Sequence, residues 1–426
     1  MSVETITLGC RLNFAESEAM KAGAPDGTVI VNSCAVTAEA VRQTRQAIRR
    51  VRRERPEARI VVTGCAAQLE PESFAAMSEV DLVVGNGGKL DSSSLVLSGG
   101  EAVVEGRSPV TAPFDCGSPE PPLTTTRKIR HTPLGATPPV AAGFSQRVRS
   151  FVAVQTGCDH RCTFCTIWQA RGPSVTLPYS AVRDTVAREL DAGAREIVLT
   201  GVDVTSVEGG LGRLSERLLG DLPGLRRLRL SSLDSVEMDE ALFALIAGEP
   251  RLMPHFHLSL QAGDDLILKR MKRRHSRADA VRLVERIKAA RPDATIGADL
   301  IAGFPTETEE AALNTLKLLA DCDVIAAHIF PFSPRPNTPA ARMPQVERET
   351  VKARAARLRE AAARRRSAWL DSLIGTTQPV LIENSEKGHT DSFAPVFVAG
   401  SHRGQTGAVH ITGRRADDHL VGTFVQ

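Results

Sequence analysis

Residues 151–165 read Phe-Val-Ala-Val-Gln-Thr-Gly-Cys-Asp-His-Arg-Cys-Thr-Phe-Cys, and the architecture of the chain can be worked out from them. The first five residues are mostly apolar or β-branched, which predicts a buried strand. Cys158, Cys162 and Cys165 follow on a tight loop directly after that strand. Three thiolates at this spacing can each bind one iron of a 4Fe–4S cubane and leave the fourth iron open to another ligand.

The loop has one alternative interpretation, a zinc site in which His160 completes a Cys3His set. His160 lies between the cysteines on the same short loop. Zinc sites usually recruit a second pair of ligands from farther along the chain. The spacing therefore favours the iron–sulfur cluster.

Downstream of the loop, strand and helix patterns alternate for six rounds, as in a (βα) barrel. Amphipathic helices fill the gaps between the strands, and barrels of this kind carry their chemistry at the carboxyl ends of the strands. The pattern predicts a partial (βα)6 barrel with strands at Phe151–Gln155, Glu196–Thr200, Leu228–Ser231, His255–Leu260, Thr295–Ile301 and Ile325–Phe330.

Upstream, residues 3–90 also alternate between strand and helix, which predicts a parallel α/β sheet. Cys10, Cys34 and Cys65 each come just after one of its predicted strands. In a parallel sheet these strand ends share one edge, with neighbours ~4.8 Å apart, so the three thiols can converge. The alternative is three buried cysteines that act as small hydrophobic residues.

We expect an α/β protein with three domains and a linker. The N-terminal α/β domain covers residues 1–105, and a Pro/Thr-rich linker follows at 106–147. The partial barrel and a basic helix cover 148–372. Four short alternating strands at 373–426 predict a small all-β barrel.

Composition excludes several classes of protein. The chain has 426 residues, of which 42 % are hydrophobic and 24 % charged, with a net charge of +3. These values exclude a wholly disordered chain, and no apolar run reaches the ~18 residues of a membrane span. The first ten residues lack a basic segment, so we expect a cytoplasmic protein without a signal peptide. Cys116 and Cys322 have no partners in spacing and are interpreted as structural or incidental.

The cysteine loop resembles the signature of the radical S-adenosylmethionine (SAM) enzymes. The resemblance implies that the open iron binds SAM and that an electron from the cluster cleaves it to a 5′-deoxyadenosyl radical. Gly201, Ser232 and Gln261 lie where predicted barrel strands stop, and we expect them to neighbour SAM. Their alternative role is that of ordinary turn and cap residues.

Motifs along the whole chain resemble the methylthiotransferases. In that family the three N-terminal cysteines hold a second 4Fe–4S cluster with an open iron, and the C-terminal β-domain is of the TRAM type. The segment Val36–Arg45 and the opening Thr-Leu-Gly-Cys look most like the branch acting on N6-threonylcarbamoyladenosine in tRNA. The matching motifs are Thr7-Leu-Gly-Cys-Arg-Leu-Asn13 with Glu16-Ser17, Asn32-Ser-Cys-Ala-Val-Thr37, Val62-Thr-Gly-Cys-Ala-Ala-Gln68, Arg171-Gly172, Met271-Lys-Arg-Arg-His-Ser276, Gly303-Phe-Pro-Thr-Glu307 and Pro331-Phe-Ser-Pro334.

The resemblance implies transfer of a methylthio group to adenine C2 at tRNA position 37, with no catalytic side chains beyond the cluster ligands. The implied partners are the tRNA anticodon loop and a flavodoxin- or ferredoxin-like electron donor, while the sulfur donor stays unknown. Two departures concern the substrate pocket, Trp168-Gln169 after the cysteine loop and Asp203 in place of Asn or His.

Basic stretches at 42–53, 269–277 and 351–366 are candidate phosphate contacts or merely solvated helix faces. Two alternatives keep the chemistry but act on isopentenyladenosine of tRNA or on a ribosomal-protein aspartate. A third, from another class, is a non-catalytic metal-dependent RNA-binding protein.

Overall fold

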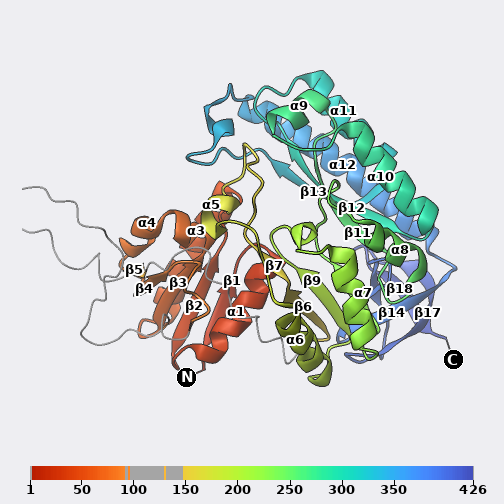
Figure 1. The fold of residues 1–426 in the computed structure, drawn as a ribbon, viewed down its shortest axis with the longest axis horizontal. Helices are drawn as coiled ribbons and strands as arrows, with labels where there is room; N and C mark the ends of the chain where they lie inside the picture. Colours follow the sequence, from red (N-terminus) through yellow and green to blue (C-terminus); the bar gives the residue numbers. More distant parts are fainter. Residues whose placement is uncertain (1, 92–94, 96–128, 131–146, 426) are drawn as a thin grey trace, which may run out of the picture. The chain divides into compact units, whose positions relative to one another are not determined.

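The computed structural model describes residues 2–91, 95, 129–130 and 147–425 (Figure 1). Contacts divide them into two compact units. The first holds the described residues up to 130 together with Gln169–Arg171, and the second holds 147–168 and 172–425. Cys116 and almost all of the predicted linker at 106–147 lie outside the described residues.

The first unit is built on a five-stranded parallel sheet in the order β1-β2-β3-β4-β5. All six residues of β2 are buried, so neither face of that strand reaches solvent. The predicted α/β domain is confirmed, and all its strands have their carboxyl ends at one edge. The strands are β1 Glu4–Thr7, β2 Thr28–Ser33, β3 Arg59–Gly64, β4 Leu82–Val84 and β5 Ile129–Arg130.

Strand β5 corrects the prediction for the linker, because it lies inside 106–147 and pairs with β4. A two-residue strand at a sheet edge is held by backbone hydrogen bonds, so it needs no apolar pattern in the sequence. The helices of this unit are α1 Arg11–Gly23, α2 Ala38–Glu54, α3 Cys65–Leu69 and α4 Pro71–Ala75. Helix α2 begins where Thr37 accepts a hydrogen bond from the Ala40 amide.

The second unit contains all six predicted barrel strands. Its strands form two parallel sheets, β10-β9-β6 and β11-β12-β13. Parallel bridges at Leu228–Leu252 and Leu233–Leu258 join the two sheets, so the strands follow one another as in a partial barrel. The strands are β6 Arg149–Ala153, β9 Glu196–Thr200, β10 Leu228–Leu230, β11 His255–Gln261, β12 Thr295–Ala302 and β13 Val324–Pro331, with a β7–β8 hairpin at Gln155–Thr156 and Val175–Thr176.

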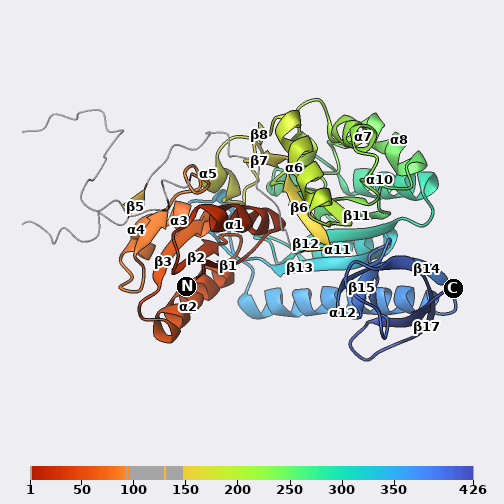
Figure 2. The same ribbon diagram turned by 90° about the horizontal axis from the view of Figure 1, so that it is seen from below.

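Helices connect these strands and cover the barrel. The long basic helix α12 runs beside β13 in both ribbon views (Figures 1 and 2). It buries Ala355 and Leu358 against Ala302 of β12. The helices are α5 Ile167–Arg171, α6 Tyr179–Asp191, α7 Leu211–Asp221, α8 Glu240–Gly248, α9 Asp265–Arg270, α10 Arg277–Ala290, α11 Glu309–Asp321 and α12 Arg348–Ser372, with 3-10 turns at Val204–Ser206 and Pro339–Arg342.

The C-terminal strands close into the predicted small barrel, in the order β14-β15-β16-β18-β17. The sequence predicts four of them and misses β15. Near β15 the turn residue Phe393 stacks on His255 of β11, with ring centroids 5.3 Å apart. This turn, together with the apolar contacts of Trp369 with the core of the small C-terminal barrel, joins that barrel to the rest of the second unit. The strands are β14 Thr377–Asn384, β15 Lys387–Thr390, β16 Pro395–Phe397, β17 Thr406–Arg414 and β18 Leu420–Phe424.

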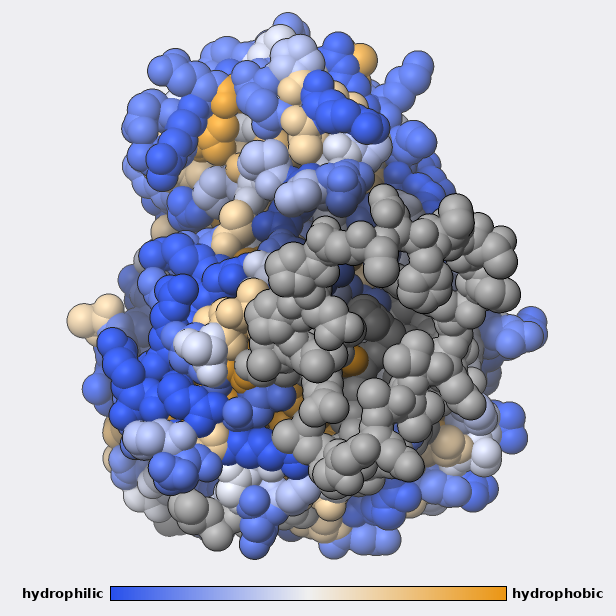
Figure 3. All heavy atoms as spheres, turned by 90° about the vertical axis from the view of Figure 1, so that its left-hand side faces the viewer, coloured by the Kyte–Doolittle hydropathy of each residue, from blue (hydrophilic) through white to orange (hydrophobic). Residues whose placement is uncertain are grey.

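No helix among the described residues is long and apolar enough to cross a membrane. On the face drawn in Figure 3, hydrophilic side chains predominate where described atoms are visible. Cys322 is buried at the end of α11, in keeping with its predicted structural role.

Candidate metal centres and cofactor site

The cysteine loop of the second unit begins at a glycine that no other residue can replace without strain. Gly157 has φ +74°, and a Cβ there would lie 1.8 Å from the carbonyl oxygen of Pro173. The Cys158 amide donates to Gly172 O at 3.1 Å, and the Cys165 amide donates to Cys162 O at 3.1 Å. These contacts fold the loop tightly, so the three predicted ligands come from one short segment.

Cys162 is buried and lies beside a paired arginine. Arg273 Nη1 lies 3.8 Å from Cys162 Sγ, and its Nη2 donates to Asp234 Oδ2 at 2.6 Å. The Ile167 amide donates to Cys165 Sγ at 3.3 Å. Hydrogen bonds to sulfur of this kind favour thiolates, which are the form that binds iron.

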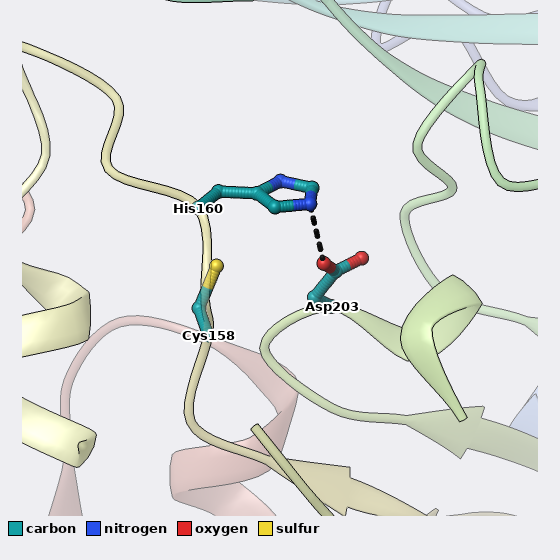
Figure 4. A group of neighbouring side chains, drawn as sticks. All are labelled: Cys158, His160 and Asp203. Carbon is teal, nitrogen blue, oxygen red and sulfur yellow. Dashed lines mark ion pairs between the residues drawn. The ribbon is translucent and has the colours of Figure 1, made fainter. Parts of the chain in front are cut away.

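His160 points to carboxylates, and its side chain converges with those of Cys158 and Asp203 (Figure 4). His160 Nε2 lies 3.6 Å from Asp203 Oδ2 and 3.3 Å from Glu237 Oε1. The hydrogen bond with Glu237 raises the pKa of His160 despite partial burial. Among described residues, the ligand atoms that converge here are one sulfur, one nitrogen and one carboxylate oxygen, which is not the Cys3His set of the zinc interpretation.

A cavity of about 450 Å³ opens beside this histidine. Its lining is almost entirely charged, with both signs present, which suits a zwitterionic ligand better than an apolar one. The lining residues are Asp159, His160, Arg161, Asp203, Ser206, Glu237, Lys272, Arg273 and Arg274.

The three predicted neighbours of SAM lie at strand ends, as expected, but they differ in their surroundings. Gly201 follows β9, where a Cβ would lie 2.8 Å from both Gln155 O and Gln155 Oε1. Gln261 ends β11 with φ +66°, an uncommon conformation for a side-chain-bearing residue. Ser232 follows β10 and is exposed.

The sequence misses Gln155, the residue that ties two strand ends together. Gln155 Oε1 accepts from the amides of Val202 and Asp203, and its Nε2 donates to Gly157 O. It is completely buried. A lone polar residue at the end of the predicted apolar strand is the signal that could have found it.

In the first unit, Cys10, Cys34 and Cys65 follow β1, β2 and β3. Gly9 lies so close to Cys34 that a Cβ would be 2.7 Å from Cys34 Sγ. Gly64 has φ +93°, and a Cβ there would lie 2.4 Å from Ser33 O. The charges of Cys10 and Cys65 each raise the pKa of Cys34, so the three thiols influence one another.

Both sets of thiols offer donor atoms that suit a metal centre. Burial raises the pKa of Cys34 and that of Cys158 to about 12, and neighbouring thiolates add to the effect. Without a metal such cysteines are neutral thiols, and a bound cation such as iron would favour the thiolate forms that each bind one iron of a cubane. The donor chemistry in both units therefore fits a 4Fe–4S cluster.

The sequence also misses a buried ionic group in the first unit, formed by Glu16, Lys89 and Arg171. Glu16 belongs to a motif quoted above, three residues after Asn13, which places the two on one face of α1. Buried polar residues at this spacing are a visible signal. Nothing in the sequence around Lys89 indicates its role.

Comparison with known folds defines the class. A family described as "Radical SAM superfamily" matches residues 152–319, and one described as "Uncharacterized protein family UPF0004" matches residues 2–85. The solved structure of the radical SAM methyltransferase TsrM from Kitasatospora setae, with tryptophan and a SAM analogue bound, is similar at 17% identity and a TM-score of 0.51. The alignment covers 78% of this chain and 68% of that one. The segment that matches the radical SAM superfamily, residues 152–319, contains the barrel strands β9 to β12 and the three-cysteine loop.

Curated relatives define the family. A threonylcarbamoyladenosine tRNA methylthiotransferase MtaB from Rickettsia prowazekii is 40% identical over 92% of this chain and 90% of its own length. The protein of the same name from Thermotoga maritima is 34% identical over 90% of this chain and 86% of its own. A tRNA-2-methylthio-N(6)-dimethylallyladenosine synthase from Erythrobacter litoralis is 32% identical over 89% of this chain and 86% of its own length. The chain belongs to this methylthiotransferase family.

Proposed function

We propose that this protein adds a methylthio group to C2 of N6-threonylcarbamoyladenosine at position 37 of tRNA. The observation that carries the proposal is the 40% identity, over 92% of the chain, to a methylthiotransferase named for that nucleoside. The relative named for the dimethylallyl nucleoside is 32% identical. The motifs around Cys10 and Cys34 support the same branch.

The six cysteines are the ligands in this proposal. Cys158, Cys162 and Cys165 hold one 4Fe–4S cluster, and Cys10, Cys34 and Cys65 hold a second. When bound, the first supplies the electron that cleaves SAM to a 5′-deoxyadenosyl radical, and the second carries the sulfur to be transferred. The cysteines lie after strands or on a tight loop, and the Ile167 amide and Arg273 would stabilise the negative charges of Cys165 and Cys162.

SAM would lie at the strand ends of the second unit. Position 201 needs a glycine because Gln155 packs against it, and Gln155 fixes the turn that follows. Gln261 and Ser232 end neighbouring strands. The charged cavity at His160, Asp203 and Glu237 offers carboxylates to the amino group of SAM and cations to its carboxylate.

The tRNA would meet basic side chains that are not already engaged within the protein, and many of the candidates are engaged. Arg45 pairs with Glu70 and Arg52 with Asp81. Arg354 is buried against Glu307. Fewer basic residues are therefore available to contact tRNA phosphates than the sequence suggests. On α2, the exposed Arg50 and Arg53 have no ion pair with a described acid.

The remaining assignments complete the proposal. The anticodon loop is the part of the tRNA that presents position 37. Reduction of the clusters needs a low-potential flavodoxin- or ferredoxin-like donor, and the sulfur donor stays open. We place the protein in the cytoplasm, where its tRNA substrate is found.

The test uses protein reconstituted anaerobically with iron and sulfide, then incubated with SAM, a reductant and unmodified-C2 tRNA. Nucleoside mass spectrometry should show the 2-methylthio form of N6-threonylcarbamoyladenosine. A methylthio group found only on isopentenyladenosine, or on a ribosomal-protein aspartate, would contradict the proposed substrate. A colourless protein that contains zinc and binds tRNA would instead identify the non-catalytic RNA-binding protein.

A further inference from the structure

In the described part of the first unit, two basic side chains and one acidic side chain are buried near the three cysteines. Glu16 of α1 accepts from Lys89 Nζ at 2.6 Å and from Arg171 Nη1 and Nη2 at 2.7 and 2.9 Å. The three side chains are between 2 % and 5 % exposed. Among the described residues, Lys89 and Arg171 share this one carboxylate, so the basic side chains of this buried group outnumber the acidic one.

Two asparagines connect this ionic group to the cysteine loops. Arg171 Nη2 donates to Asn13 Oδ1 at 2.7 Å, and Asn13 Nδ2 donates to Leu8 O at 2.7 Å. Lys89 Nζ also donates to Asn86 Oδ1 at 2.8 Å. Burial lowers the pKa of Lys89, and the charge of Glu16 opposes this effect and favours the ammonium form.

The same asparagines approach the sulfurs. Asn13 Oδ1 accepts from Cys10 Sγ at 3.7 Å, and Asn86 Nδ2 donates to Cys65 Sγ at 3.9 Å. The ionic group and the three thiols therefore lie in one electrostatic environment, assembled from five separate parts of the chain.

An excess charge in a dry interior is costly unless an anion balances it. A cubane held by three thiolates is a net anion in both of its redox states, and the charge around a cluster is one of the factors that set its reduction potential. A purely structural tie between α1 and α5 would need only one arginine and one carboxylate. Lys89 is the charge that such a tie leaves unexplained.

We propose that Lys89 and Arg171, positioned by Glu16, form a buried cationic group. This group stabilises the cluster on Cys10, Cys34 and Cys65 and raises its reduction potential. The three are positioning residues, because they act through the thiolates and the asparagines. The inference rests on the second cluster of the proposed function.

The experiment measures the potential of that cluster alone. The full-length chain carries Cys158→Ala, Cys162→Ala and Cys165→Ala, is reconstituted with iron and sulfide, and is titrated with dithionite while electron paramagnetic resonance follows the reduced cluster. In this background Lys89→Met removes the excess charge, and Glu16→Gln increases it. Lys89→Arg keeps it, and Lys21→Met removes a charge from an exposed position of α1.

A cationic group of this kind predicts shifts of the reduction potential in opposite directions for two of the variants. Lys89→Met should lower the potential and Glu16→Gln should raise it, while Lys89→Arg and Lys21→Met should stay near the parent value. A structural tie predicts lost stability without this signed pattern, so equal potentials in all variants would overturn the inference and leave the second cluster standing. If Lys89→Met binds no iron, Glu16→Gln decides by the sign of its shift. A parent chain without any cluster would overturn both the inference and the second cluster.

Discussion

In the second unit, Cys158, Cys162 and Cys165 share one loop, whereas Cys10, Cys34 and Cys65 of the first unit follow three different strands. The loop is shaped by local contacts such as the hydrogen bond from the Cys158 amide to Gly172 O. The strand-end set depends on the pairing of β1, β2 and β3, which lie side by side in register.

The two sets also differ in the charges around them. Arg273 next to Cys162 is balanced by Asp234, and more carboxylates lie close by at Asp203 and Glu237. Around the first set, the described residues include two buried basic side chains, Lys89 and Arg171, and one buried acidic side chain, Glu16. Each set thus offers three sulfurs of its own, and the charges around the two sets differ. This difference suits two clusters that perform different tasks.

The largest expected effect separates the tasks of the two sets. Replacing Cys158, Cys162 and Cys165 together by Ala should abolish SAM cleavage, because no cluster remains to deliver the electron. Replacing Cys10, Cys34 and Cys65 should leave SAM cleavage in place and abolish methylthio transfer. Chromatography of 5′-deoxyadenosine and mass spectrometry of the tRNA measure the two outcomes. Loss of SAM cleavage in both triple variants would contradict this division.

A second comparison uses the glycines that precede a cysteine in each unit. Gly157→Ala and Gly64→Ala each place a Cβ against a carbonyl oxygen, at 1.8 and 2.4 Å, in a strained backbone conformation. Each variant should lose about half of the iron, from its own unit only. Gly193→Ala and Gly27→Ala are matched controls, because their φ is also positive but no atom lies within 4 Å.

Iron and sulfide analysis checks this result. Both controls should keep full iron while losing about 1 kcal/mol of stability. Gly157→Ala protein with full iron would show that the loop does not need its tight turn.

A third comparison concerns a balanced buried carboxylate, Glu196 of β9. Burial alone would raise its pKa, but Arg229 and Arg227 outweigh burial and lower the pKa from 4.5 to about 2. Because the folded-state pKa is below the ordinary value, these ion pairs stabilise the fold fully above pH 4.5. Their contribution is lost as the pH falls towards 2.

Glu196→Gln should therefore cost about 3–5 kcal/mol at pH 6 and less at pH 3. Both tryptophans of the chain, Trp168 and Trp369, lie in the second unit, so urea unfolding followed by their fluorescence reports on it. The exposed Glu208→Gln is the control. If the difference in unfolding free energy between the variant and the wild type is equal at the two pH values, Glu196 is not ionised in the folded protein.

The smallest effect concerns tRNA affinity. Arg50→Gln with Arg53→Gln should weaken tRNA binding several-fold and reduce the slope of log affinity against log salt by about one per residue. Arg42→Gln on the same helix should change less, because Arg42 already pairs with Glu39 at 2.7 Å. Filter binding at several salt concentrations measures both. An unchanged slope would remove α2 from the tRNA contact surface.

Much of the fold follows from the sequence, because apolar and β-branched runs mark buried parallel strands wherever both faces are covered. All six barrel strands and β1 to β4 were predictable in this way. Strand β5 and strand β15 were not. A two-residue edge strand and a four-residue strand with Gly388 inside it bury too little to leave a pattern.

The site was predictable to the extent that it is local. The spacing of Cys158, Cys162 and Cys165 indicates a cluster by itself, and the parallel-sheet rule brings Cys10 and its partners to one edge. The surrounding charges were not predictable. Lys89 and Glu16 are 73 residues apart, and only the folded structure brings them together.

The proposed function requires two separate cubanes, one for each set of three cysteines. The most direct measurement is the iron and sulfide content of anaerobically reconstituted full-length protein, alongside the two triple cysteine variants and supported by Mössbauer spectra. We expect about eight iron atoms for each wild-type chain and about four for either variant, all in cubanes. About four iron atoms in the wild type, unchanged when Cys10, Cys34 and Cys65 are replaced, would contradict this expectation.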